Sequence, residues 1–165
     1  MSLNTNLIRS CQVGFSTNKT GFPLTGNLYD MLDLVEKYFD AKAFETELAS
    51  LPGKFAPPSG RLLVAHHDGI PAGTVALRDL DNQICEMKSM FVDSQYLGKG
   101  MGRALAEAII QEAHIIGYTK MRLDTGPRQI AAQTLYRSLG FLEIHPYYEL
   151  PQELAEKMLF MELSL

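Results

Sequence analysis

The 165-residue sequence has only two cysteines and no run of basic residues. Cys11 and Cys85 lie far apart and form no CxxC pair, which disfavours a disulfide framework, a redox motif and a cysteine-based metal site. The formal net charge of −4 disfavours nucleic acid as a partner, because proteins that neutralise phosphate chains usually gather Lys and Arg into a basic stripe.

Long apolar stretches are also missing. No segment approaches the roughly 20 apolar residues that cross a bilayer, and residues 1–10 lack the charged-then-apolar pattern of a secretion signal. The sequence therefore predicts a cytoplasmic protein with no membrane partner. Its 46% hydrophobic and 21% charged residues are typical of globular proteins, and its length favours one domain spanning residues 1–165.

Hydrophobic periodicity predicts both helices and strands. Apolar residues recur at helical spacing over residues 25–50, and the proline-rich residues 51–60 are expected to form an ordered loop without regular structure. A later helix is expected to stop at Gly117, and another to span residues 129–139. The predicted strands are residues 61–66, 72–78, 83–92, 118–124, 141–144 and 157–163. This alternation indicates an α/β (α+β) fold with a mixed sheet.

A glycine-rich stretch between a predicted strand and a predicted helix carries the strongest functional signal. It reads Gln95-Tyr96-Leu97-Gly98-Lys99-Gly100-Met101-Gly102-Arg103. Alternate glycines let backbone N–H groups turn toward a ligand, and the helix start adds free N–H groups and a positive dipole end. The stretch favours an anion such as a pyrophosphate, with a simple tight turn as the alternative. It fits neither the dinucleotide fingerprint nor the Walker A loop, which disfavours a nucleotide-binding module.

Residues 86–141 resemble the GNAT superfamily of N-acetyltransferases. The run Gln95-Tyr96-Leu97-Gly98-Lys99-Gly100 matches the family signature of Gln or Arg, two residues, Gly, one residue, and Gly or Ala. Residues 117–125 are similar to the family's helix end and fifth strand, and residues 135–141 to its late helix running into the sixth strand. The resemblance implies a mixed, mostly antiparallel central sheet with helices on both faces and a splay between strands four and five.

The resemblance also implies that acetyl-CoA binds across this splay as a co-substrate, without a metal. Backbone groups of residues 90–92 would pair with the pantetheine arm, and N–H groups of residues 97–102 would hold the pyrophosphate. Gln129 stands where many members have Asn, and Ala132 leaves room beside Tyr136. The expected cofactor-binding residues are Met90, Phe91, Val92, Gln95, Leu97, Gly98, Lys99, Gly100, Met101, Gly102, Arg103, Gln129 and Ala132.

Tyr136 is the predicted general acid of an acetyl transfer from acetyl-CoA to a primary amine by direct attack in a ternary complex. The departing thiolate needs a proton, and a phenol within hydrogen-bond reach can supply it. The alternative is a tyrosine packed in the core with its hydroxyl at the surface. At the level of function, the alternative is a catalytically silent acyl-CoA-binding sensor or regulatory domain.

Glu86 is the predicted general base, acting directly or through water, because an ammonium group cannot attack. The alternative is an ion pair with Lys88 or another cation. On a regular strand Glu86, Lys88 and Met90 would point to one face, and Met87 and Phe91 to the other.

Other residues receive weaker interpretations. His66 and His67 point to opposite faces and make a poor metal pair, and Asp124 is interpreted as a loop cap. Tyr147 and Tyr148 are favoured slightly as a substrate wall over simple loop packing. The acceptor is a small-molecule or peptide amine that the sequence leaves unidentified, and the family resemblance allows a homodimer.

Overall fold

The computed structural model of the chain describes residues 8–10, 46 and 49–165. The chain divides into two compact units, residues 1–11 with 54–165, and residues 12–53. Cys11 and nearly all of the helical segment predicted over residues 25–50 lie outside the described residues. The expectation of a single domain stays a prediction.

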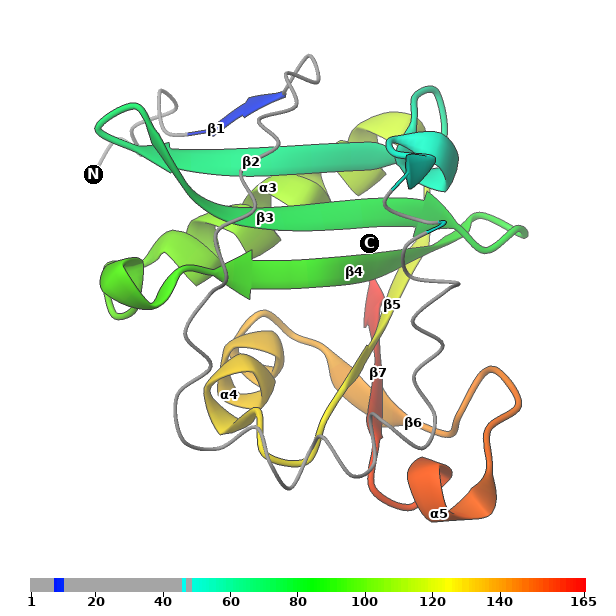
Figure 1. Ribbon diagram of the computed structural model, residues 1–165. Coiled ribbons are helices and arrows are strands. Elements are labelled where there is room, and N and C mark those ends of the chain that lie inside the picture. Colours follow the sequence, from blue (N-terminus) through cyan, green and yellow to red (C-terminus); the bar gives the residue numbers. More distant parts are fainter. Residues whose placement is uncertain (1–7, 11–45, 47–48) are drawn as a thin grey trace. The chain divides into compact units, whose positions relative to one another are not determined.

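Within the described part of the chain, seven strands form one sheet in the order β1-β2-β3-β4-β5-β7-β6 (Figure 1). Neighbouring strands are antiparallel except β4 and β5, which are parallel. The predicted mixed, mostly antiparallel sheet is therefore confirmed. The strands are β1 (Ile8–Ser10), β2 (Arg61–His67), β3 (Ile70–Asp79), β4 (Ile84–Val92), β5 (Lys120–Thr125), β6 (Leu142–Ile144) and β7 (Leu159–Ser164).

Strands β4 and β5 separate soon after they begin. They pair only over residues 84–86 of β4 and residues 120–122 of β5. Beyond this point β4 continues to Val92 and β5 to Thr125, and Figure 1 shows β5 running away from β4. The edge of β4 after Glu86 therefore has no strand partner on the β5 side among the described residues. The predicted splay between the fourth and fifth strands is present.

The predicted helix that stops at Gly117 and the predicted helix over residues 129–139 are both present, whereas a short helix over residues 152–155 was not predicted. The described helices are α3 (Met101–Ile116), α4 (Ile130–Ser138), α5 (Gln152–Ala155) and the 3-10 turns η2 (Gly53–Phe55) and η3 (Ser94–Tyr96). Helix α3 ends at Gly117, whose φ of 100° is left-handed and favours glycine, as predicted. The loop at residues 51–60 was expected to lack regular structure, but η2 lies inside it because the buried Phe55 ring anchors a short turn there.

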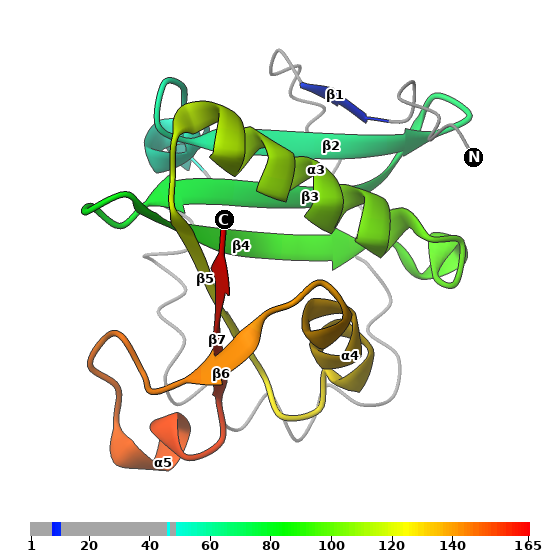
Figure 2. The same cartoon turned by 180° about the vertical axis from the view of Figure 1, so that it is seen from behind.

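The hydrophobic core lies between one face of the sheet and helices α3 and α4 (Figure 2). Along α3, Leu105, Ile109 and Ala113 recur every four residues and are fully buried. On β5, Met121 and Leu123 are buried at alternate positions, as a strand with one covered face requires. The opposite face of β3, β4 and β5 carries charged side chains instead.

A β-bulge interrupts this alternation on β4. Val75 of β3 lies opposite both Ser89 and Met90 of β4, so β4 has one extra residue at this point. Ser89 takes a left-handed φ of 53°. An extra residue shifts the phase of a strand, so the residues after it exchange faces.

The bulge corrects one expectation about side-chain directions. Met90 and Val92 pack against the core that contains Met87, whereas Phe91 is 51% exposed. The predictions that Met90 shares a face with Glu86, and that Phe91 shares a face with Met87, are therefore wrong. Strict period-two alternation holds only up to Ser89.

Candidate active site

The glycine-rich stretch forms a turn that connects η3 to α3. Gly98 and Gly100 have φ values of 75° and 80°, a conformation that favours glycine. Gly100 is the N-cap of α3, and within the described residues no side chain caps the helix. The first N–H groups of a helix have no intrahelical partner. The turn therefore presents free backbone donors beside the positive end of the α3 dipole.

The turn is open in front of its glycines. A Cβ atom added at Gly98 or Gly100 would meet no described atom within 4 Å. The neighbouring Leu97 is 64% exposed. A diphosphate could therefore approach the backbone closely, so the residues present here fit the pyrophosphate of acetyl-CoA.

Lys99 and Arg103, two of the expected cofactor-binding residues, both lie at this turn. The Lys99 ammonium lies 5.1 Å from the centroid of the Tyr96 ring. Arg103 donates from Nη2 to Ser138 Oγ of α4 at 2.7 Å, and its Nη1 lies 3.4 Å from Glu107 Oε1. The Arg103–Ser138 bond joins the first turn of α3 to α4, the helix that carries Tyr136.

The Tyr136 ring is buried, and it lies against Phe141 with ring centroids 5.8 Å apart. Its hydroxyl donates to no described residue. In the described part of the chain, every buried side-chain nitrogen or oxygen atom has a hydrogen-bond partner. The hydroxyl therefore keeps access to solvent. Burial, reinforced by the negative charge of Asp124, raises the pKa of Tyr136 to about 12. The phenol thus stays protonated at neutral pH, as a general acid requires.

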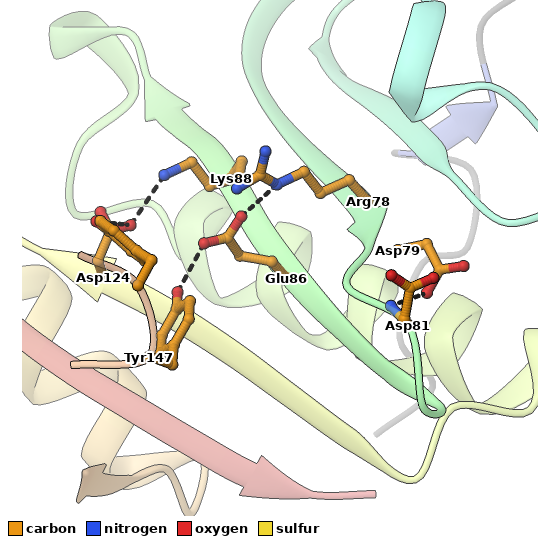
Figure 3. Close-up of polar contacts among 8 residues, drawn as sticks. Arg78, Asp79, Asp81, Glu86, Lys88, Asp124 and Tyr147 are labelled. Carbon is orange, nitrogen blue, oxygen red and sulfur yellow. Dashed lines mark hydrogen bonds and ion pairs between the residues drawn. The ribbon is translucent and has the colours of Figure 1, made fainter. Parts of the chain in front are cut away.

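Glu86 lies at the centre of a buried polar cluster. Its side chain is fully buried, Oε2 accepts from Arg78 Nε, and Oε1 accepts from the Tyr147 hydroxyl at 2.6 Å. Figure 3 shows the Glu86 carboxylate between these two partners. The ion pair considered as an alternative is therefore present, with Arg78 and not with Lys88. Glu86 has no exposed oxygen with which to contact an amine directly.

A pocket of about 440 Å³ lies beside this cluster. Tyr147 and Tyr148 both line this pocket, and their role as a substrate wall stays a prediction. Burial, the hydrogen bond to Glu86 and the charge of that carboxylate raise the pKa of Tyr147. The described lining residues are Lys54, Arg78, Leu80, Lys88, Arg122, Tyr147 and Tyr148.

Asp124 belongs to the same polar face and does not cap a loop. Its Oδ2 accepts from Lys88 Nζ at 2.9 Å (Figure 3). It also accepts from the Tyr148 hydroxyl at 3.1 Å. The loop-cap interpretation is wrong because β5 continues to Thr125, which leaves Asp124 inside the strand and facing β4.

Gln129 and Ala132, two expected cofactor contacts, lie at the start of α4. Gln129 is the N-cap residue, and its Oε1 accepts from Thr125 Oγ1 at 2.6 Å. Ala132 is partly buried against the core one turn before Tyr136. Their roles toward acetyl-CoA stay predictions.

Sequence reasoning missed Arg78 and Arg122, although both line the pocket. Arg122 donates from Nε to Glu162 Oε2 at 2.7 Å, and its guanidinium lies 5.2 Å from the centroid of the Tyr147 ring. For Arg122 the available signal was period-two placement, because it alternates with the buried Met121 and Leu123 on β5, whereas Arg78 follows three consecutive buried residues and carries no such signal.

The remaining candidates stay outside this site. Burial raises the pKa of the Cys85 thiol to about 12, which makes it a poor nucleophile. His67 Nδ1 lies 3.3 Å from Asp68 Oδ2, and the His67 ring packs against the Tyr96 ring. Across the described ranges, no three His, Cys, Asp or Glu side chains gather as a metal site would require, and no helix is long and apolar enough to cross a membrane.

Comparison with known proteins gives consistent results. Residues 28–141 match the acetyltransferase (GNAT) family. An uncharacterized N-acetyltransferase of Schizosaccharomyces pombe is 34% identical over 151 residues, which cover 86% of this chain and 91% of that protein. Human N-acetylaspartate synthetase is 35% identical over 126 residues, which cover 72% of this chain but only 41% of that protein.

Solved structures share the fold. An acetyltransferase of Streptococcus agalactiae superposes with a TM-score of 0.66 at 19% identity, covering 84% of this chain and 87% of that one. A GNAT acetyltransferase of Elizabethkingia anophelis with acetyl-CoA bound superposes with a TM-score of 0.57 at 22% identity, covering 91% and 95%. With its open glycine turn, its separating strands and these relatives, the chain belongs to the GNAT acetyltransferase family.

Proposed function

We propose that this protein is an acetyl-CoA-dependent N-acetyltransferase that transfers the acetyl group to a primary amine by direct attack in a ternary complex. The open turn at Gly98 and Gly100 carries the proposal. It leads into α3, near the edge of β4 that has no strand partner among the described residues, and α3 is bonded to the helix of Tyr136. Relatives named as N-acetyltransferases support an amine as acceptor.

Acetyl-CoA supplies the activated acetyl group as a thioester. The N–H groups of residues 97–102 would hold its pyrophosphate, and the backbone of residues 90–92 would hold the pantetheine arm along the edge of β4. The bulge at Ser89 supports this role, because it leaves Met90 and Val92 packed in the core and so fixes the backbone between them.

Tyr136 is the proposed general acid. Formation of the amide bond breaks the carbon–sulfur bond, and the departing thiolate takes a proton from the phenol. A tyrosine whose pKa is about 12 keeps this proton throughout the neutral range.

Glu86 is the proposed general base, with Tyr147 as the route to it. Tyr147 lines the pocket, and its hydroxyl donates to Glu86 Oε1 at 2.6 Å. An amine proton can pass to the Tyr147 oxygen while the Tyr147 proton passes to the carboxylate, so the amine loses one proton and Glu86 gains one.

Changing Tyr147 to Phe is expected to lower kcat about 10- to 100-fold, because the variant keeps the ring and loses the proton route. KM for acetyl-CoA should change by less than about twofold. Tyr148→Phe is the matched control, since that hydroxyl lies in the same pocket but bonds Asp124. Steady-state kinetics measure both variants, and a Tyr147→Phe enzyme with wild-type kcat would eliminate the route.

Changing Gly100 to Val is expected to raise KM for acetyl-CoA at least about 10-fold. A β-branched residue at a φ of 80° strains the turn by about 1–2 kcal/mol and places a side chain before the backbone donors. Gly69→Val is the matched control, because Gly69 has a φ of 81° and similarly open surroundings in the β2–β3 turn. Equal KM values in both variants would show that the Gly100 turn does not hold the co-substrate.

The proposal as a whole is tested by acetyl-CoA turnover against a panel of amines, read as free thiol. Turnover on at least one amine supports it. Tight CoA binding without turnover on any amine would instead support a silent acyl-CoA-binding domain. A melting temperature unchanged by millimolar CoA would argue against both functions.

A further inference from the structure

We propose, on the basis of the function proposed above, that the acceptor is a small amine carrying at least one carboxylate, and that Arg122 with Arg78 and Lys88 binds this carboxylate. The pocket volume of about 440 Å³ lies in the range of small-molecule sites. Among the described residues no acidic side chain lines the pocket, whereas Arg78, Lys88 and Arg122 all do.

Both arginines keep donors available for a ligand. Arg78 bonds Glu86 through Nε, and Arg122 bonds Glu162 through Nε. Among the described residues neither guanidinium bonds a partner through its Nη atoms. Two Nη atoms of one guanidinium can bind a carboxylate in a bidentate fork, which is the strongest common form of carboxylate recognition.

Arg122 is also held in place before any ligand arrives. Its Nε is fixed by Glu162 at 2.7 Å, and its guanidinium lies over the Tyr147 ring at 5.2 Å from the centroid. A preorganised group loses less conformational entropy on binding than a flexible one.

The charges around the pocket leave room for an anion. Arg122 pairs with Glu162, which also pairs with Lys120 outside the pocket lining. The other two pairs each match one cation with one carboxylate. None of the three carboxylates lines the pocket, so the charged side chains among its described lining residues are all cationic and suit a ligand carboxylate.

The same pocket contains the proposed proton route. Tyr147 lies under Arg122 and bonds Glu86. A carboxylate held by Arg122 would therefore place a nearby amine of the same molecule within reach of Tyr147. This geometry favours acceptors of amino-acid size, in which amine and carboxylate are a few bonds apart.

The test compares acceptors that differ only in charge. Glutamate, glutamine and glutaminamide, with the matching aspartate series and spermidine, are assayed with acetyl-CoA. Carboxylated acceptors are expected to show kcat/KM at least about 10-fold above the fully amidated analogue and spermidine, since a hydrogen bond to a charged group contributes that much discrimination. Equal or better turnover of amines without a carboxylate would overturn this inference and leave the acetyltransferase function standing.

Arg122→Gln tests the residue directly. It is expected to lower kcat/KM for carboxylated acceptors about 10- to 100-fold, mainly through KM, and for amidated acceptors less than about twofold. Lys120→Gln is the matched control: it removes one cation from the same Glu162 but lies outside the pocket lining. Equal effects of the two variants would overturn the inference. Arg122→Lys, which keeps the charge but loses the fork, gives an intermediate loss and serves if Arg122→Gln does not fold.

If no amine is acetylated, the proposed function fails, and calorimetric titration of glutamate and aspartate into CoA-saturated protein decides the carboxylate site separately. Binding that weakens at least about 10-fold in Arg122→Gln would support the site, and absence of binding would overturn it.

Discussion

Replacing Tyr136 with Phe is expected to lower kcat for acetyl transfer about 10²-fold or more, because the departing thiolate then lacks its proton donor. KM for acetyl-CoA should stay within about twofold, since the ring and its packing against Phe141 remain. The variant should fold normally, because the Tyr136 hydroxyl bonds no described residue. Steady-state kinetics with thiol detection give both constants.

A second buried tyrosine provides the control for this experiment. Tyr118 is 8% exposed, its hydroxyl donates to Ser59 O at 2.9 Å, and burial raises its pKa to about 12 as well. Tyr118→Phe should lower the free energy of unfolding by about 1 kcal/mol and leave kcat unchanged. In the wild-type enzyme, deprotonation of Tyr136 should lower kcat only as the pH approaches 12. A Tyr136→Phe enzyme with wild-type kcat would remove this residue from the mechanism.

Changing Arg78 to Met is expected to lower the free energy of unfolding by about 3 kcal/mol. The substitution leaves the fully buried Glu86 carboxylate without its cation, and an unpaired buried charge is strongly destabilising. Urea denaturation followed by circular dichroism measures the change.

Two further variants separate this effect from a simple loss of packing. In the Arg78→Met, Glu86→Gln double variant the buried charge is gone, so much of the lost stability should return. Arg137→Met breaks an exposed ion pair with Glu143 and should change stability by less than about 1 kcal/mol. Similar losses in Arg78→Met and Arg137→Met would show that Glu86 does not depend on Arg78.

Features set by local sequence were predictable here. Strands β2 to β7 and helices α3 and α4 follow from hydrophobic periodicity, whereas β1 and α5 were not predicted, and the end of α3 follows from Gly117. The turn at Gly98 and Gly100 follows from the need for left-handed backbone. Each of these depends on residues close together in the chain.

Features set by strand register could not be predicted in the same way. The partner of Glu86 is Arg78 because β3 and β4 pair in a register that places these residues opposite each other. Asp124 bonds Lys88 because β5 lies next to β4, although 36 residues separate the two in sequence. Pattern analysis gives each residue a face but does not say which residues of a neighbouring strand lie beside it.

In the function proposed above, the bulge at Ser89 separates the part of β4 that faces the acceptor pocket from the part that holds acetyl-CoA. Before it, Glu86 and Lys88 form ion pairs on the charged face beside the proposed acceptor pocket, while after it Met90 and Val92 pack against the core. In that function, relatives could diversify the first half to accept new substrates without disturbing the half proposed to hold the co-substrate. Acceptor choice and acyl-donor binding can evolve separately along a single strand.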